Sequence, residues 1–405
     1  MRKKLSALFL GAVLILSTFT SCSENNTQIP PPATSDVVAE TTEAEESGSS
    51  ETAAVVQEVT EGSGETETLF SPDFEIEKLE NGIKRVTDGD GRELILVPKA
   101  LGEIPAEYAD SIVITTPVDN AVFLSSTQVC TFRTVNDPAI LDGIGAVEGD
   151  AETWSDISDI ADRIASGDII DISGDTGIGE PDYEKIQALN PDVVFVYTGE
   201  YGQQTTIAKL DELGINYAVD NEYMESSYLA RMEWMRFLLT FFDADEAADK
   251  VMANVQHGID TVKAEIAGKD KPVIAVFSVY NGAVSATKDE GWTGSMIADM
   301  GGVNAFRGMD ASALTMEAAF DVINTADVVI YTAIPSYCNG MAGVIDAFPQ
   351  ITECRAYEND RVYQYSDIFW YGIDQSDIMA CDMAAVLYPE VFADRTLSYY
   401  IKLEK

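Results

Sequence analysis

The stretch GIGEPDYEKIQALNPDVVFVYTG, residues 177–199, decides the fold. Within it, Glu180–Leu189 is typical of a short helix, with Pro181 near its start and Asn190–Asp192 ending it. Val193–Tyr197 follows as an unbroken apolar run, which is typical of a strand covered on both faces. A helix leading directly into a buried strand predicts one unit of a parallel α/β sheet.

The same alternation continues on both sides of this stretch. Strands are predicted at 93–97, 111–114, 193–197, 216–219, 273–277, 327–331 and 361–365. Helices are predicted at 180–189, 207–213, 292–300, 316–323 and 375–387, with Gly214 as the C-cap of the second. Residues 226–267 show only helical periodicity, in two segments (228–242 and 245–267) that meet at Phe242–Asp245. We therefore predict two Rossmann-like α/β lobes with parallel central sheets, joined by a long rigid helical segment.

The two predicted lobes echo each other. Glu184 precedes Asp192 and its buried strand in the first lobe, and Glu317 precedes Asp327 and its buried strand in the second. The spacing differs, because Glu184 lies eight residues before Asp192 and Glu317 lies ten before Asp327.

The N-terminus carries an export signal. Arg2, Lys3 and Lys4 precede the apolar run Leu5–Leu16, which is too short for a comfortable membrane span, and small residues lead to Cys22. A Cys in this place resembles the lipobox of bacterial lipoproteins, although Phe19 replaces the usual Leu or Val. The resemblance implies that Cys22 is lipidated; the alternative is ordinary cleavage nearby.

The chain is strongly acidic, with 69 acidic and 25 basic residues among 405 and a net charge of −44. Eleven of the acidic residues fall between Cys22 and Phe70, a Ser/Thr/Glu/Pro-rich stretch without aromatics that predicts a disordered tether. The acidity of the remainder excludes nucleic acid as a partner and direct attraction to anionic lipid.

These signals divide the chain into five predicted segments. They are a signal peptide at 1–22, an acidic tether at 23–69, an N-terminal α/β lobe at 70–225, an inter-lobe helical segment at 226–268 and a C-terminal α/β lobe at 269–405. We expect a monomer, held by a lipid anchor at the outer face of the cell membrane.

Residue usage argues against catalysis and against a metal centre. The single histidine, His257, falls on the polar side of its helix, so neither a multi-histidine zinc site nor a Ser/His/Asp triad is expected. A haem with two axial histidines is excluded, whereas ligation by Tyr or Met stays open. The sequence lacks G-x-x-x-x-G-K-[ST], so it is not a transporter ATPase. Cys130, Cys338, Cys354 and Cys381 are widely spaced and settle neither disulfides nor free thiols.

Three segments carry a resemblance to a known family. Residues 177–199, GWTGSMIADMGGVNAF at 291–306 and NDRVYQYSDIFWYGIDQSD at 359–377 resemble substrate-binding proteins of ABC importers, in the group that carries iron–siderophore complexes, haem or cobalamin. The likeness covers roughly residues 85–395. It implies a ligand held between two lobes, no cofactor of the protein's own, and an ABC permease with its ATPase as partners.

The resemblance also implies that one Glu on each lobe docks onto arginines of the permease. Glu184 matches this position in the first lobe and Glu317 in the second, where Ala326 replaces the usual Pro. The alternative for both is a carboxylate stabilised by the helix dipole.

Aromatic residues at predicted strand ends are the candidate ligand walls, because rigid rings bury much area at low entropic cost. The predicted ligand-binding residues are Trp154, Tyr197, Tyr201, Tyr280, Trp292, Trp370, Tyr371 and the loop residue Arg133. Arg307 is a second loop arginine that could meet an anionic chelate, and a surface ion pair is the alternative for both. Trp234 is expected in the core.

The expected function is capture of an iron chelate, either a siderophore or haem, for an importer. A cobalamin or corrinoid receptor of the same class is the alternative, and a tethered surface enzyme or adhesin is a third hypothesis.

Overall fold

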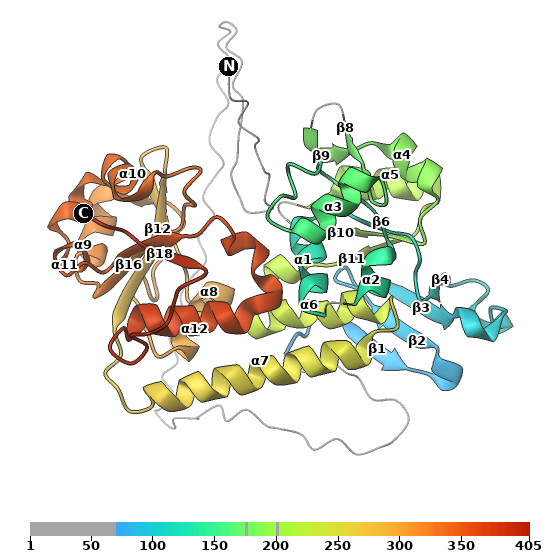
Figure 1. The fold of residues 1–405 in the computed structure, drawn as a ribbon, viewed down its shortest axis with the longest axis horizontal. Coiled ribbons are helices and arrows are strands. Elements are labelled where there is room, and N and C mark those ends of the chain that lie inside the picture. Colours follow the sequence, from blue (N-terminus) through green and yellow to red (C-terminus); the bar gives the residue numbers. More distant parts are fainter. Residues whose placement is uncertain (1–69, 136, 175–176, 200–201) are drawn as a thin grey trace, which may run out of the picture. The chain divides into compact units, whose positions relative to one another are not determined.

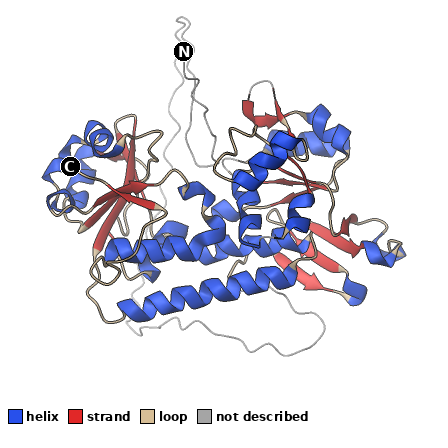
Figure 2. Ribbon diagram, viewed as in Figure 1, coloured by secondary structure: helices blue, strands red, loops and turns tan. Residues whose placement is uncertain are grey.

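The computed structural model describes residues 70–405 apart from 136, 175–176 and 200–201. The predicted signal peptide, the tether, Cys22 and Tyr201 lie outside the described residues. Figure 1 shows two α/β lobes with helices between them, and Figure 2 separates their helices and strands. The predicted fold class is confirmed, with differences in the sheets.

A small four-stranded sheet precedes the first parallel sheet. Its strands, in spatial order, are β1 (Glu75–Lys78), β2 (Lys84–Thr87), β3 (Glu93–Pro98) and β4 (Ile112–Thr116). Only the β3–β4 pair is parallel. The predicted strands at 93–97 and 111–114 therefore exist, but they lie in a separate sheet and not in the parallel sheet of the lobe.

The central sheet of the first lobe is wholly parallel. Its strand order is β11-β10-β5-β6-β7, so that β5 and β10, which are far apart in the sequence, are neighbours. The strands are β5 (Ala121–Phe123), β6 (Ile144–Val147), β7 (Ile170–Asp171), β10 (Val193–Val196) and β11 (Tyr217–Val219). The helices are α1 (Ser126–Val135), α2 (Pro138–Asp142), α3 (Ser158–Ser166), α4 (Tyr183–Leu189) and α5 (Gln204–Leu213).

The stretch that led to the fold prediction begins its helix later than expected. Glu180 and Pro181 end the strand β9 (Gly177–Pro181), which pairs with β8 (Ser173–Gly174), and α4 starts at Tyr183. The helix starts late because the Asp182 side chain caps it, accepting hydrogen bonds from the backbone N–H groups of Glu184 and Lys185. Asn190 ends α4 in the left-handed conformation (φ 47°), and all of β10 is buried.

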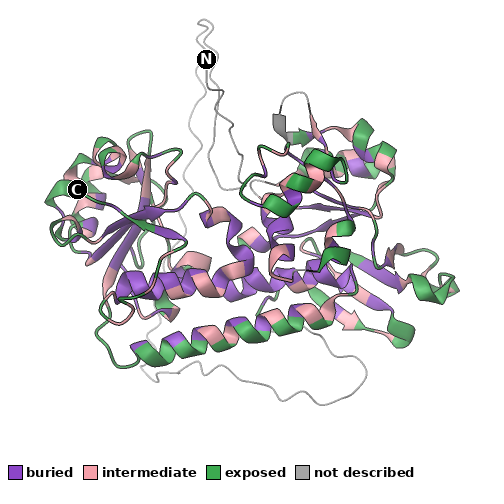
Figure 3. Ribbon diagram, in the orientation of Figure 1, coloured by how far each residue is buried: buried purple, intermediate pink, exposed green. Residues whose placement is uncertain are grey.

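Two helices form the segment between the lobes. They are α6 (Tyr228–Thr240) and α7 (Asp245–Ile266), and they meet at the turn where Asp243 has a φ of 54°. In Figure 3, α6 is buried almost throughout, whereas α7 is buried on one face only. Every third or fourth residue of α7, such as Met252, Val255 and Ile259, points inward, and His257 is exposed as expected.

The sheet of the second lobe is mixed. Its order is β15-β13-β12-β16-β17-β18, with β14 also paired to β12. The strands are β12 (Val273–Tyr280), β13 (Ala283–Ala286), β14 (Val303–Asn304), β15 (Leu314–Thr315), β16 (Val328–Tyr331), β17 (Val362–Tyr365) and β18 (Tyr400–Lys402). The predicted parallel centre is present in β12, β16 and β17, while β13, β15 and β18 are antiparallel to their neighbours.

The helices of the second lobe are α8 (Trp292–Asp299), α9 (Met316–Ile323), α10 (Gly340–Ala347), α11 (Arg355–Glu358) and α12 (Ser376–Leu387). The bounds of α8, α9 and α12 lie within one residue of the prediction, whereas α10 and α11 were not predicted. Short 3-10 helices in the described chain are η1 (Glu80–Gly82), η2 (Lys99–Leu101), η3 (Ala106–Tyr108), η4 (Glu222–Met224), η5 (Pro349–Glu353), η6 (Phe369–Tyr371) and η7 (Ile373–Gln375). Both η6 and η7 follow the end of β17.

One buried apolar cluster joins the two lobes. It runs from Phe123 and Phe195 of the first sheet, through α6 and α7, to Val276 and Ile330 of the second sheet. Close packing of this kind is stiff, because each side chain is fixed by its neighbours. Within residues 70–405, as far as they are described, no helix is long and apolar enough to cross a membrane.

Candidate functional site

The carboxyl ends of the central parallel strands hold the polar and aromatic residues of interest. In the first lobe Glu148 follows β6, Tyr197 follows β10 and Asp220 follows β11. In the second lobe Tyr280 ends β12, and η6 comes shortly after β17. Ligands of open α/β sheets bind at such strand ends.

Trp292 and Trp370 lie in one aromatic group of the second lobe. Phe369 contacts both, with ring centroids 6.1 Å from Trp292 and 5.2 Å from Trp370. Trp292 and Trp370 are half-buried, whereas Phe369 is buried. Two of the predicted ligand walls are thus brought together with their rings partly accessible.

Arg231 connects this aromatic group to the first lobe. Its guanidinium lies over the Trp292 ring, 4.6 Å from the centroid, and its Nε donates to Glu222 Oε2 at 2.5 Å. Arg231 comes from α6 and Glu222 from η4, directly after β11. Both are buried, so this ion pair is screened little by solvent.

Beside the pair lie two further buried polar side chains that the sequence analysis missed. Asp220 and Gln128 are each 1% exposed. Burial, and next the charge of Glu222, raises the pKa of Asp220 well above its usual value. Gln128 faces Asp220 without meeting hydrogen-bond geometry, and neither its amide nor Asp220 Oδ2 has a partner in the described chain. Their positions just after β5 and β11 could have marked them as strand-end residues. That they lie close together follows only from the strand order, in which β10 alone separates β5 from β11.

Arg133 is a helical residue, which corrects its assignment to a loop. It lies in α1 and donates from Nε and Nη2 to Asp374 at 3.1 and 2.7 Å, and from Nη2 to the Tyr371 carbonyl at 2.6 Å. Thr134 also donates to Asp374 Oδ2, at 2.5 Å. Arg133 therefore joins α1 to η6 and η7 through three hydrogen bonds.

Tyr371 lies beside this junction. It is 3% exposed, and its hydroxyl has no hydrogen-bond partner among the described residues. Burial raises the pKa of Tyr371, and the Cys130, Asp156 and Tyr337 side chains raise it further. Residues of both lobes therefore act on this hydroxyl. We call Arg231, Trp292, Trp370 and Tyr371 the strand-end site.

Tyr197 forms a second, adjacent group. Its ring meets the Tyr223 ring edge-on at 5.8 Å, and burial, then the charge of Glu148, raises the pKa of Tyr197 to about 12. The Glu148 carbonyl accepts a hydrogen bond from Trp154 Nε1 at 2.9 Å. Tyr197 is thus half-buried at the expected strand end, beside a carboxylate.

The other predicted residues differ in how far they are exposed. Trp154 is 4% exposed and packs in the core, so its ring serves the fold of its loop. Tyr280 is 45% exposed at the end of β12. Arg307 is exposed in the segment after β14. Trp234 is fully buried, as expected.

Two exposed residues near strand ends were missed by the sequence analysis. Met224 is 54% exposed in η4, and Tyr337 is 61% exposed in the segment after β16. No periodicity marks them, because they lie in irregular segments.

Glu184 and Glu317 occupy equivalent places in the two lobes. Each is the second residue of its helix, α4 or α9, and each is exposed. The Asp that follows each helix also acts alike. Asp192 accepts from the backbone N–H of Asp119 at 2.8 Å, and Asp327 from that of Val273 at 2.8 Å, so each secures the neighbouring strand.

No metal-binding group emerges from the part of the chain that is described. Within it, no three His, Cys, Asp or Glu side chains gather as a metal site would require. Cys130, Cys338, Cys354 and Cys381 form no disulfide there.

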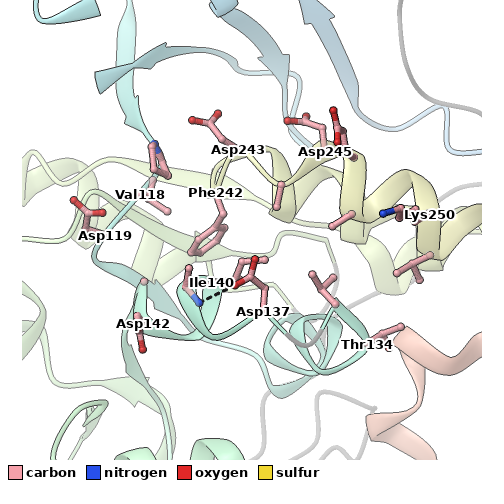
Figure 4. Close-up of a pocket in the computed structure, with 18 of the residues that line it drawn as sticks. Val118, Asp119, Thr134, Asp137, Ile140, Asp142, Phe242, Asp243, Asp245 and Lys250 are labelled. Carbon is pink, nitrogen blue, oxygen red and sulfur yellow. Dashed lines mark hydrogen bonds between the residues drawn. The ribbon is translucent and has the colours of Figure 1, made fainter. Parts of the chain in front are cut away.

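A cavity of about 980 Å³ lies elsewhere, between the α1–α2 connection and the α6–α7 turn (Figure 4). Its acidic lining comprises Asp119, Asp137, Asp142, Asp243, Asp245 and Glu246. Lys84 bridges Asp243 and Asp245 at 3.2 and 2.6 Å, and Asp137 caps α2. Among the described residues, no predicted ligand residue lines this cavity, and Phe242 is the one lining residue with an aromatic ring. We therefore do not place the ligand there.

Two α/β lobes on a shared helical core, with strand ends carrying the accessible rings, define a two-lobed binding protein. Residues 161–368 match the periplasmic binding protein family, and the chain belongs to that family. It is accordingly a substrate-binding protein of the ABC-transporter type and not an enzyme.

Similar proteins agree with this class. The uncharacterized lipoprotein MJ0878 of Methanocaldococcus jannaschii is 28% identical over 301 residues, which cover 72% of this chain and 70% of the relative. A periplasmic solute binding protein from Veillonella parvula has a TM-score of 0.53 at 18% identity, covering 78% of this chain and 89% of that one. A periplasmic haem-binding protein from Pseudomonas aeruginosa has a TM-score of 0.52 at 11% identity, covering 71% and 98%. At these identities the two structures show a shared fold.

Proposed function

We propose that the chain is the extracytoplasmic substrate-binding lipoprotein of an ABC importer, and that it captures a metal chelate for delivery to a permease and its ATPase. The observation that carries this proposal is the strand-end site, where half-buried Trp292 and Trp370 lie beside groups from both lobes. Rings of this kind suit a large, rigid ligand. The basic patch, apolar run and Cys22 support export and lipid anchoring.

Binding is tested by tryptophan fluorescence. The purified chain is titrated with haem, a ferric siderophore and cobalamin, in wild type and in Trp292→Phe and Trp370→Phe variants. We expect a saturable change with one of these chelates, and a smaller change in the variants. Trp234→Phe is the matched control, because Trp234 is fully buried and its ring packs against Phe74 and Phe237. Absence of saturable binding to all of them would contradict the chelate function.

A corrinoid is the second candidate ligand. The Gln128 amide and the Tyr371 hydroxyl lack hydrogen-bond partners among the described residues, and such groups can pair with the amide side chains of a corrin. The same titration distinguishes the candidates.

We propose further that Glu184 and Glu317 dock onto basic residues of the permease. Their equal positions at the starts of α4 and α9 give one exposed carboxylate to each lobe. Such a pair would set the orientation of the binding protein on its partner.

Charge reversal tests the docking role. We expect Glu184→Arg with Glu317→Arg to reduce uptake at least about tenfold while chelate affinity is unchanged, because like charges at an interface repel. Glu246→Arg is the matched control, since Glu246 is exposed and is also the second residue of its helix, α7. Unchanged uptake in the double variant would rule out docking through these residues.

A further inference from the structure

The ring of Trp292 is supported from outside its own lobe. Trp292 is the first residue of α8, and its side chain is half-buried. The guanidinium of Arg231, from the inter-lobe helix α6, covers one face of the ring, with its central carbon 4.6 Å from the ring centroid. A guanidinium that lies flat on an indole attracts it and stacks on it. The orientation of this partly accessible ring therefore depends on Arg231.

Arg231 is itself fixed by the first lobe. Its Nε donates to Glu222 Oε2 at 2.5 Å, and both side chains are more than nine-tenths buried. Glu222 begins η4, shortly after β11. The carboxylate meets the edge of the guanidinium and the Trp292 ring lies on its face, so one side chain makes both contacts. A continuous series of contacts thus runs from the first lobe to a ligand wall of the second.

Other contacts fasten α8 as a helix and do not touch this ring. The backbone N–H of Tyr228 donates to Ser295 Oγ at 3.2 Å, and the Tyr228 hydroxyl donates to Asp299 Oδ2 at 2.9 Å. Lys263 of α7 also pairs with Asp299, at 3.1 Å. These contacts place the helix, and the contact with Arg231 places the ring that the helix carries.

Resting on the proposed function, we infer that Arg231 is a positioning residue of the chelate site. Glu222 fixes Arg231, and Arg231 fixes the Trp292 ring against which the ligand packs. Arg231 acts through this ring and not through a contact of its own with the ligand. A ring that is fixed before binding loses little rotational freedom when the ligand arrives, and this preorganisation increases affinity. The first lobe thereby sets the shape of a ligand wall that the second lobe carries.

A double-mutant cycle tests whether Arg231 acts through the ring. The variant Arg231→Met with Glu222→Gln removes both charges, so that neither is left buried without its partner. Its dissociation constant for the chelate that wild type binds best is measured with Trp292 present and in a Trp292→Leu background. We expect a loss of affinity of about fivefold with Trp292 present and of less than about twofold without it. Equal losses in the two backgrounds, or no loss with Trp292 present, would overturn the positioning role.

Two further variants separate the ring from the helix. Arg231→Lys keeps a cation for Glu222 but lacks the planar group, so its loss of affinity should also depend on Trp292. Lys263→Met is the matched control, because it removes a half-exposed ion pair to Asp299 of α8 and leaves the ring contact in place. We expect Lys263→Met to bind as wild type does. A loss as large as that of the Arg231 variants would mean that loosening of α8, and not of the ring, is the cause.

Fluorescence without ligand separates this role from the chelate function. The signal of Trp292 is the difference between a protein and the same protein with Trp292→Phe. We expect acrylamide to quench this signal more strongly, and its anisotropy to fall, in Arg231→Met with Glu222→Gln. An unchanged signal would overturn the positioning role, whether or not a chelate binds. The expected change in a protein whose wild type binds no chelate would instead contradict the chelate function, while the contact of Arg231 with the ring would stand.

Discussion

The two lobes share a structural unit and differ at their strand ends. Helices α4 and α9 each start with an exposed glutamate at the second position, and each leads to an Asp that secures the neighbouring strand. At the strand ends the first lobe has the Tyr197 and Tyr223 rings and the buried Asp220, and the second has the Trp292 and Trp370 rings.

This difference indicates a division of work within one binding protein. The repeated unit presents equivalent carboxylates on both lobes, as contact with a single symmetric partner would need. The unequal strand ends enclose different chemistry, as a ligand with both an apolar body and polar groups would need.

The largest expected effect comes from breaking the contact that joins the lobes at α1. Asp374→Ala leaves Arg133 without its carboxylate partner, and we expect the free energy of unfolding to fall by about 3–5 kcal/mol. Chemical denaturation measures it. Asp367→Ala is the control, because Asp367 is exposed between β17 and η6. A loss of less than about 1 kcal/mol would show that the lobes are held by the apolar core alone.

The second prediction compares Trp154 of the first lobe with Trp370 of the second in their effects on chelate binding and on stability. Trp370→Ala is expected to weaken chelate binding by about 1–3 kcal/mol, because a half-buried aromatic wall is removed. Trp154→Phe should lower the free energy of unfolding by about 1–3 kcal/mol, since it loses a buried hydrogen bond and ring volume. It should weaken chelate binding less than Trp370→Ala does, because its ring packs in the core. Calorimetric binding and denaturation curves check both. The reverse pattern would exchange the roles that we assign to the two residues.

The smallest expected effect is a change in stability at alkaline pH, and it arises in the first lobe. Burial raises the pKa of Tyr197 from its usual 10.0 to about 12, so the folded state holds this proton more tightly than the unfolded state. Tyr197 therefore contributes stability that is complete below pH 10 and is lost as the pH rises through about 12. Tyr197→Phe should make stability less dependent on pH in that window, as measured by denaturation. An unchanged pH dependence would contradict the raised pKa.

Local patterns predicted the fold class and part of its elements, but not β5, β6 and β7 or α1, α2 and α3 of the first lobe. The unbroken apolar runs of β10 and β16 identified buried strands, and α9 lies at the predicted residues because Thr315 caps it and Ile323 ends its apolar face. Gly214 ends α5 in the left-handed conformation, as predicted. Strands β1 and β2 were not predicted, and the predicted β3 and β4 pair with them in a separate sheet and not with the parallel sheet of the lobe.

The site was less predictable, because it depends on contacts distant in the sequence. Aromatics at strand ends were found from spacing, and Trp292 and Trp370 do lie together. Arg133 and Asp374 are 241 residues apart in the sequence, so no local pattern predicts that they pair. Asp220 and Gln128 face each other because β11, β10 and β5 are neighbours in that order.

The central claim is that a chelate is held between the strand ends of both lobes. Hydrogen exchange of the full chain, with and without the chelate that binds best, tests it most directly. We predict simultaneous protection of residues 148–157 and 222–231 in and beside the first lobe and of 291–296 and 366–374 in the second. Protection confined to one lobe, or to residues 137–143 and 242–251 around the acidic cavity, would contradict the account.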